Sequence, residues 1–287
     1  MTGPTDPADD AADGPDGYPR RPIIRPGIPI TLSTSSAFPE TTGTAFAIAA
    51  EQGYDGMEVM VLADPVSQDA DALRRLMDRH QLPVTSIHSP CLLVTSRVWS
   101  TDPLVKLGRS LELAERVGAS VVVVHPPFVW QRTAAADFAA SVAELQTRTA
   151  VKIAVENMFP MTVARGRLTV NTYRPHWNPL SSKYQHYTLD LSHTATSGID
   201  AMKMATTMGN ALTHLHLADG SGSAKDEHLV PGRGTQPCVE ILELLVGKDY
   251  RGAVCIEIST RGMSRSRRED DVAQSLTFAR LALQTPR

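Results

Sequence analysis

Carboxylate and imidazole side chains recur in this chain directly after short runs of β-branched residues. Asp190 and His193 stand three residues apart, where a predicted strand ends before the turn residue Gly198. Neutral imidazole nitrogens and ionised carboxylate oxygens are good ligands for zinc, and also for manganese, cobalt or iron. Similar residues follow other predicted strands: His88, His125, Glu156, His216, Asp226, His228 and Glu257. No cysteine belongs to this set, so it predicts an open catalytic metal site and not a closed structural zinc site.

The segments that must position these residues alternate between two kinds. Short β-branched runs are typical of buried strands, and the amphipathic stretches between them are typical of helices. The predicted strands cover residues 29–33, 56–61, 84–88, 120–125, 151–156, 187–190, 212–217 and 253–258. The predicted helices cover residues 41–52, 69–81, 103–117, 134–145, 199–208, 236–246 and 270–283. This α/β alternation over 287 residues favours a single (β/α)8 TIM barrel over a doubly wound open sheet.

The positions of the polar residues favour the barrel as well. In a TIM barrel the carboxyl ends of the strands form one ring, where the loops present catalytic side chains around a common axis. Acidic groups in an apolar barrel mouth are costly to bury unpaired, and a divalent cation would compensate Glu156, Asp190 and Glu257 together. The residues at or near predicted strand ends are His88, His125, Glu156, Asp190, His216 and Glu257.

Composition limits the remaining possibilities. Residues 1–21 hold five Asp and two Arg, a net charge of −3, and the whole chain is also −3, so the body is electrically balanced. This segment has almost nothing to bury and is expected to be a disordered acidic tail, with the barrel covering residues 22–287. The apolar runs are too short to span a bilayer, and we expect neither a signal peptide nor a membrane segment. Three cysteines without CxxC spacing favour a reducing cytoplasm.

Several motifs resemble a known superfamily. They are Ile87-His88-Ser89-Pro90, Val124-His125, Asp190-x-x-His193-Thr194-x-x-x-Gly198, and His216-Leu217-Ala218-Asp219 followed by Asp226-Glu227-His228 and Gly232-Arg233-Gly234. Glu156 in Ala154-Val155-Glu156-Asn157 and Glu257 in Ile256-Glu257-Ile258 complete the pattern. With these motifs, the region from Ile30 to Ala282 resembles the xylose isomerase-like TIM barrels (apurinic endonuclease family 2). That superfamily includes endonuclease IV and many sugar isomerases and epimerases.

The resemblance implies different metal sites for these two kinds of enzyme. For a sugar isomerase it implies one divalent ion, held by Glu156, Asp190, His216 and Glu257. For endonuclease IV it implies up to three zinc ions. The first would be bound by His88, His125 and Glu156, the second by Glu156, Asp190, His216 and Glu257, and the third by His193, Asp226 and His228.

Two enzymatic hypotheses follow from the resemblance. The leading hypothesis is a zinc-dependent phosphoester hydrolase resembling endonuclease IV, because the full set of ligand types is present in order. The alternative is a metal-dependent sugar or sugar-phosphate isomerase or epimerase, using Mn²⁺ or Co²⁺ as well as Zn²⁺, with Glu156 and Glu257 as the catalytic residues. A third hypothesis is a non-catalytic barrel that only binds a ligand. The expected partner is a phosphorylated or sugar-like small molecule, or damaged DNA.

Some features depart from endonuclease IV. The position where that enzyme normally carries an aromatic side chain, which helps it to hold a distorted duplex, is occupied here by Cys91, followed by Leu92. Two basic clusters are as consistent with solvated surface as with substrate binding. One lies between residues 159 and 187 and comprises Arg165, Arg167, Arg174 and Lys183, and the other comprises Arg261, Arg265, Arg267 and Arg268.

Three further residues stand near the predicted site. Glu58 and Asp219 are expected to orient imidazoles as outer partners of the ligands. His214 stands two residues before His216. We expect its side chain to face the surrounding helices and to have a structural role.

Overall fold

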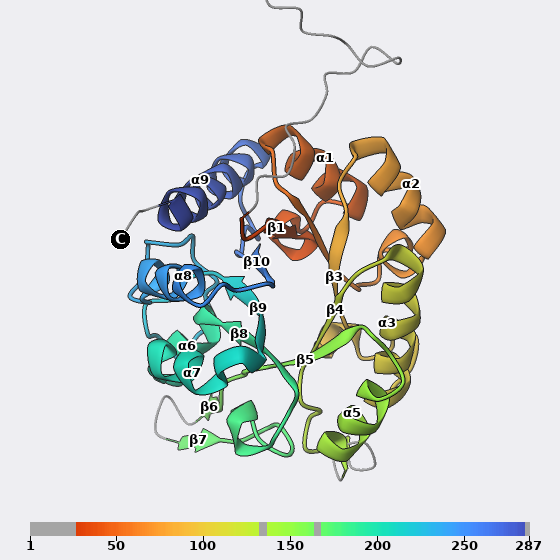
Figure 1. Cartoon of the computed structure of the whole chain (residues 1–287), viewed down its shortest axis with the longest axis vertical. Coiled ribbons are helices and arrows are strands. Elements are labelled where there is room, and N and C mark those ends of the chain that lie inside the picture. The colour runs from red at the N-terminus through yellow and green to blue at the C-terminus, as the bar shows by residue number, and fades with distance from the viewer. Residues whose placement is uncertain (1–26, 132–136, 164–167, 285–287) are drawn as a thin grey trace, which may run out of the picture.

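The chain folds into a closed barrel of parallel strands surrounded by helices, seen end-on in Figure 1. The structure is a computed structural model that describes residues 27–131, 137–163 and 168–284. The acidic tail expected at residues 1–21 lies outside the described residues. The predicted (β/α)8 TIM barrel is confirmed.

Eight strands form the barrel wall, and neighbouring strands pair in parallel in the order β1-β10-β9-β8-β5-β4-β3-β2. Every residue of β4, β9 and β10 is buried, because a TIM barrel strand faces the filled interior on one side and the helices on the other. The strands are β1 (Ile30–Ser33), β2 (Gly56–Met60), β3 (Val84–His88), β4 (Val121–Val124), β5 (Lys152–Glu156), β8 (His186–Asp190), β9 (Leu212–Leu217) and β10 (Ala253–Ile256).

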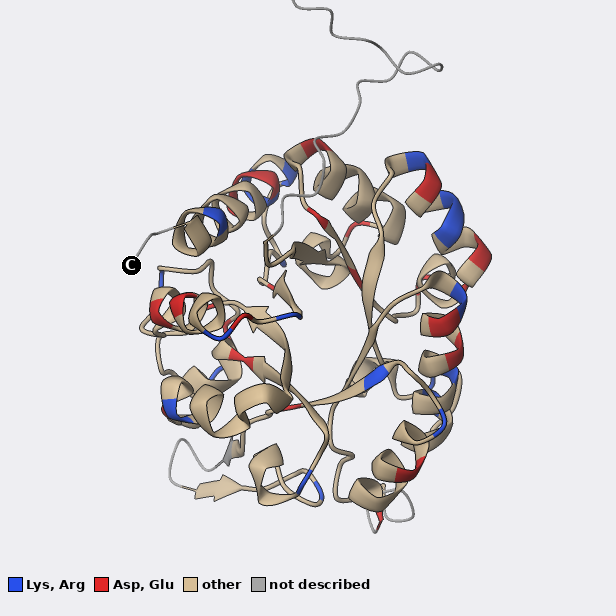
Figure 2. Cartoon of the chain, viewed as in Figure 1, with Lys and Arg blue, Asp and Glu red and all other residues tan. Residues whose placement is uncertain are grey.

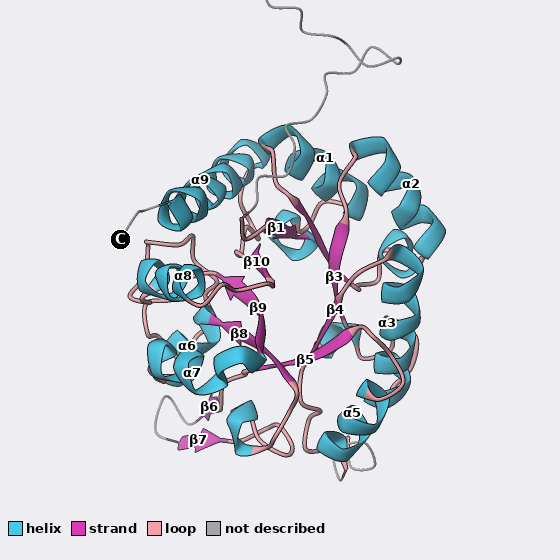
Figure 3. Ribbon diagram, in the orientation of Figure 1, coloured by secondary structure: helices cyan, strands magenta, loops and turns pink. Residues whose placement is uncertain are grey.

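Helices cover the outside of this wall (Figure 3). Many begin at a side chain that accepts a backbone N–H of the first turn, as Thr41, Asp69 and Asp102 do. Gly53 and Gly118 end two of them in the left-handed conformation. The helices are α1 (Thr42–Gln52), α2 (Ala70–His80), α3 (Pro103–Val117), α5 (Phe138–Gln146), α6 (Leu191–Ser197), α7 (Ala201–Met208), α8 (Cys238–Gly247) and α9 (Arg265–Gln284).

The main hydrophobic core lies between the barrel wall and the helices. Leu32, Ile87 and Leu189 from the strands pack there with Phe46 and Leu107 from the helices. Charged residues lie along outer helices such as α2 and α3 (Figure 2). None of the described helices is long and apolar enough to cross a membrane.

A short helix and a hairpin of two strands were not predicted from the sequence. The short helix α6 follows β8 without a break and carries His193. An antiparallel hairpin of β6 (Met161–Val163) and β7 (Leu168–Val170) interrupts the long loop between β5 and β8. The remaining predicted strands and helices match described elements to within a few residues, except that α9 begins five residues earlier than expected.

Two glycines offer a matched test of the packing around the barrel. A Cβ added to Gly252, just before β10, would lie 2.1 Å from the carbonyl oxygen of Thr213 in the neighbouring strand. Backbone cannot move away cheaply, so Gly252→Ala should lower the free energy of unfolding by about 1–3 kcal/mol. Gly108 in α3 has open space at its Cβ position, and Gly108→Ala should raise that free energy by about 0.5–1 kcal/mol. Urea unfolding of both variants measures the difference, and equal effects would contradict this account.

Candidate metal centre

The predicted ligand residues gather at one end of the barrel. His88, Glu156 and Asp190 are the last residues of β3, β5 and β8. His125 and Glu257 directly follow β4 and β10, and His216 lies near the end of β9. Parallel strands place their carboxyl ends on one rim, so residues far apart in sequence meet there.

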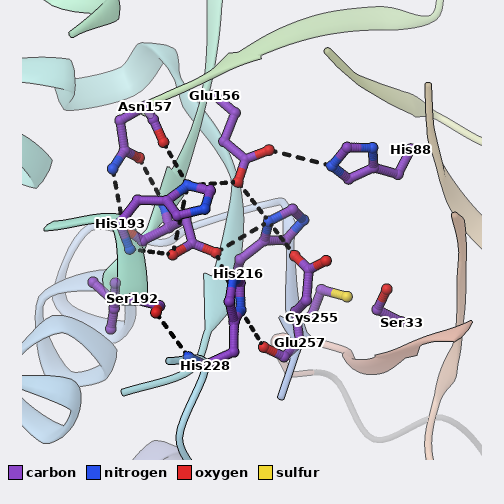
Figure 4. Close-up of polar contacts among 12 residues, drawn as sticks. Ser33, His88, Glu156, Asn157, Ser192, His193, His216, His228, Cys255 and Glu257 are labelled. Atoms are coloured by element: carbon purple, nitrogen blue, oxygen red, sulfur yellow. Dashed lines mark hydrogen bonds and ion pairs between the residues drawn. The ribbon is translucent and has the colours of Figure 1, made fainter. Parts of the chain in front are cut away.

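Glu156 lies at the centre of this group (Figure 4). Its Oε2 is 3.3 Å from His88 Nε2 and 3.0 Å from His125 Nε2. Its Oε1 is 3.1 Å from His216 Nδ1 and 3.3 Å from His193 Nδ1. The two oxygens of one buried carboxylate therefore connect two groups of imidazoles.

A second group surrounds the Nδ1 atom of His216. Glu257 Oε2 lies 2.7 Å from this nitrogen, Glu156 Oε1 3.1 Å and Asp190 Oδ2 3.6 Å. Ligand atoms of these four residues all lie within 4.8 Å of one another. Three carboxylates around one ring nitrogen require positive charge at that point, either a proton on the ring or a cation.

A third group includes residues from α6 and from the loop after β9. Asp190 caps α6 by accepting the backbone N–H of His193 at 2.7 Å, which places the His193 ring beside the rim. Asp226 Oδ2 then lies 3.3 Å from His193 Nε2 and 3.1 Å from His228 Nε2. Ser192 joins these parts, because its hydroxyl donates to Asp226 at 2.8 Å and accepts the N–H of His228 at 2.9 Å. The structure thus brings all nine predicted ligand residues together.

Asp219 shapes the loop that carries Asp226 and His228. Its carboxylate accepts four backbone N–H groups, from Gly220, Gly232, Gly234 and Gln236, at 2.8–2.9 Å. A Cβ on Gly234 would lie 2.3 Å from the Asp219 carboxylate, so only glycine fits there. Asp219 was expected to orient an imidazole, but its hydrogen bonds in the described structure fold the loop backbone instead.

The predicted orientation of His214 was wrong. Its Nε2 lies 2.8 Å from Glu58 inside the barrel, and its side chain is fully buried there. Residues two apart on a strand point to the same face, so His214 shares the interior face with His216. Glu58 contacts both imidazoles, as expected for an outer partner.

A cavity of about 270 Å³ opens above the cluster. Apolar side chains that sequence reasoning did not single out form much of its wall, among them Met60, Met158 and Ile258. Phe159 and Tyr173 also line it, and they come from the long loop between β5 and β8. The described lining includes no lysine or arginine.

The described members of the two basic clusters do not line this cavity. Arg265 and Arg267 pair with Glu269 and Asp271 on their own helix, and Arg268 is buried against Glu40. Arg165 and Arg167 lie outside the described residues.

The family profile of the xylose isomerase-like TIM barrel matches residues 46–282. The chain belongs to this family. A protein of unknown function from Mycobacterium tuberculosis is 47% identical over 278 residues, covering 91% of this chain and 99% of the relative. Among solved structures, a D-tagatose 3-epimerase-like protein is 20% identical with a TM-score of 0.62, covering 88% of this chain and 99% of that one. An AP endonuclease of family 2 from Brucella melitensis is 18% identical with the same TM-score and the same two coverages.

The donor set of this xylose isomerase-like barrel fits a divalent cation. Glu156 Oε2 and Asp190 Oδ2 are buried without a hydrogen-bond partner, although imidazole nitrogens lie close to both. Orphaned carboxylate oxygens in a dry site are expensive, and a metal ion is the natural partner for their lone pairs. Several of the surrounding imidazoles can contribute nitrogen ligands, which suits zinc, manganese or cobalt.

Charge balance sets the protonation of the metal-free cluster. Burial alone would lower the pKa of His216, but Glu257, Glu58 and Glu156 raise it well above its usual value. Burial would also lower the pKa of His193, but Asp190 and Asp226 raise it well above its usual value. Burial would raise the pKa of Glu156, but the charge of His216 and His125 holds it well below the usual range. Without metal, these residues form a buried network of carboxylates and imidazolium rings.

Replacing Asp219 tests its role in folding the loop after β9, which carries Asp226 and His228. In Asp219→Asn the amide NH2 must face backbone N–H donors, so part of the hydrogen bonding is lost. We expect the free energy of unfolding to fall by about 2–3 kcal/mol. Asp200→Asn is the matched control, because Asp200 caps α7 with one bond to Lys203 N and asparagine caps helices equally well. Chemical denaturation measures both, and an Asp219→Asn variant as stable as the control would refute this role.

The stability of the metal-free protein should fall as the pH rises from 7 to 9. Burial disfavours charged His228, but Asp226 and Asp190 raise its pKa to about 10. A group whose pKa is raised in the folded state contributes stability that is fully present below its unfolded-state pKa of about 6.5. That stability is lost as the pH approaches the folded-state pKa. Unfolding of protein prepared with a chelator measures this. His228→Asn removes this titrating ring and should flatten the decline. Asparagine is chosen because it tolerates the positive φ of 45° at this position. A wild-type curve that is flat or rising would count against the charged network.

Proposed function

We propose that this protein is a divalent-metal-dependent hydrolase of phosphoesters that acts on a small phosphorylated molecule. The observation that supports this most directly is the arrangement of the donor residues in three adjoining sets. Glu156 belongs to the first two, and the ligand atoms of Asp190, which belongs to the second, also lie within 4.8 Å of those of His193 and His228 in the third. Shared carboxylates of this kind are suited to hold metal ions close together.

The three sets define which residues would hold each ion. His88, His125 and Glu156 would hold the first, and Glu156, Asp190, His216 and Glu257 the second. His193, Asp226 and His228 would hold the third. Zinc in such sets supplies positive charge that activates water as a nucleophile near neutral pH and stabilises negative charge developing on phosphoryl oxygens.

The surrounding residues would position the substrate and exclude bulk water. The ligand side chains lie at the base of the cavity, where His88 and Glu156 are each only 1% exposed. Ser35 donates to Glu257 Oε1 at 3.2 Å and so fixes the carboxylate that reaches the cavity. No lysine or arginine in the described lining could neutralise a phosphate, so its charge would be met by the metal sets. The cavity volume and the Cys91-Leu92 sequence in place of an aromatic wedge favour a small molecule over duplex DNA.

A second candidate is a single-metal epimerase or isomerase of a polyhydroxylated sugar. It is favoured by the second donor set alone, because Glu156, Asp190, His216 and Glu257 form a complete four-residue site. The solved D-tagatose 3-epimerase-like protein shares the fold. In this reaction one of Glu156 and Glu257 would take a proton from one face of a carbon next to a carbonyl, and the other would deliver a proton to the opposite face.

Metal content separates the two candidates. We expect elemental analysis of purified protein to find two to three zinc ions per chain. His193→Ala should lose one of them, because it removes a nitrogen from the third set. The hydrolase should cleave small phosphoesters, and a chelator should stop the reaction. One ion per chain, with full activity in His193→Ala, would reject the three-metal hydrolase.

A substitution at the shared ligand completes this experiment. Glu156→Gln keeps the shape of the side chain but removes its charge, so we expect loss of metal and of turnover with the barrel intact by circular dichroism. Glu144→Gln makes the same chemical change on the exposed face of α5 and should change neither. Activity on sugars without phosphate turnover would support the epimerase. Ligand binding that needs no metal and gives no turnover would support a non-catalytic barrel.

A further inference from the structure

A buried polar cluster lies inside the barrel beneath the proposed metal sets. It contains Glu58 from β2, Ser86 from β3, and His214 and His216 from β9, all with no exposed surface. β2 and β9 are not neighbours in the barrel, so the contacts between them cross its interior. His216 belongs both to this cluster and to the proposed metal site, with one ring nitrogen facing each.

Glu58 is held firmly within this cluster. Its Oε2 accepts a hydrogen bond from the Ser86 hydroxyl at 2.9 Å and lies 2.8 Å from His214 Nε2. Both Glu58 oxygens approach the Nε2 atom of His216, Oε1 at 3.1 Å and Oε2 at 3.3 Å. Ser86 and Glu58 are also register partners on adjacent strands, so the backbone fixes their separation.

These contacts determine the tautomer of a neutral His216 ring. An ionised carboxylate can only accept hydrogen bonds, so the ring nitrogen facing Glu58 must carry the hydrogen. A neutral imidazole then has its lone pair on Nδ1, and a metal ligand must present a lone pair. Nδ1 is the nitrogen that faces Glu156, Asp190 and Glu257. The opposite tautomer would direct a lone pair at the Glu58 carboxylate and a hydrogen at the metal.

A deep metal ion bound by the cluster itself is a poorer explanation. Cys255 lies near enough to Glu58, His214 and His216 to complete such a site. Glu58 Oε2, however, already accepts the Ser86 hydroxyl, and the Cys255 thiol donates to the carbonyl oxygen of Ile256. The cluster is therefore a hydrogen-bonded support for His216.

We infer that Glu58, held by Ser86 and His214, is a positioning residue that fixes the orientation and tautomer of His216 and directs its Nδ1 lone pair at the metal. This inference rests on the metal site of the proposed function and holds whichever reaction that site catalyses.

Glu58→Gln tests the inference through metal affinity. The glutamine oxygen would face the donors Ser86 and His214, leaving its NH2 group against His216 Nε2. His216 would then have to carry its hydrogen on Nδ1, so we expect zinc affinity to weaken about 10–100-fold. Asp55→Asn is the matched control, because it makes the same chemical change at the opposite end of the barrel. There the Asp55 carboxylate accepts the backbone N–H of Ile30, the first residue of β1. Competition with a chromophoric chelator measures both dissociation constants, and thermal melts of metal-free protein check folding.

The wild-type protein provides a second readout that does not depend on a variant folding. In the zinc-loaded protein, ¹⁵N-detected histidine NMR should show His216 with hydrogen on Nε2 and metal on Nδ1. Glu58→Asp, which remains an acceptor only, should recover part of the lost affinity. The inference is overturned by a Glu58→Gln variant that binds zinc as tightly as the Asp55→Asn control, or by the opposite tautomer in the wild type. Loss of one zinc ion in Cys255→Ser would also overturn it, by showing a deep metal site. Wild-type protein that binds zinc but hydrolyses no phosphoester would reject only the proposed reaction.

Discussion

The structure depends on burying several carboxylates together at the mouth of an apolar barrel. Glu58, Glu156 and Asp190 are almost completely buried, and Glu257 is only slightly exposed. Each would be costly to bury alone, and each therefore lies against imidazoles or backbone donors. Strand order, the early start of α6 and the folding of the loop after β9 all serve to bring those partners within reach. The site is a charge-balanced unit, and removing one member leaves the others uncompensated.

Asp190 shows how local structure and chemistry are combined in one residue. Its Oδ1 caps α6 by accepting the N–H of His193, while its Oδ2 points toward His216. The same residue therefore starts a helix, places an imidazole and contributes to the proposed metal set. Asp219 has a comparable role in the next loop, where four backbone N–H groups fold around its carboxylate. Precise ligand placement in this barrel thus comes from backbone hydrogen bonds as well as from side-chain packing.

The sequence predicted the barrel well because alternating apolar runs and amphipathic stretches report burial directly. It also predicted which residues meet, since parallel strands must place their carboxyl ends together. It missed α6 because Ser192, His193 and Thr194 are weak helix formers, although Asp190 and Gly198 are typical of a helix start and a helix end. The error at His214 came from treating residues two apart as facing opposite ways. The cavity wall could not be predicted, because Met60, Met158 and Ile258 look like ordinary core residues until the loops are placed.

The number of bound ions and the charge of the substrate are physically connected in this site. With three divalent cations, six positive charges would meet the four carboxylates Glu156, Asp190, Asp226 and Glu257, and the excess would attract an anionic phosphate. With one cation, the same carboxylates would exceed the metal charge, and His193 and His228 would remain protonated beside Asp226. A site balanced in that way has no positive charge left for a phosphate and suits an uncharged sugar. In the proposed function, His193, Asp226 and His228 would therefore influence the choice between the two reactions by setting the charge that the cavity offers to its substrate.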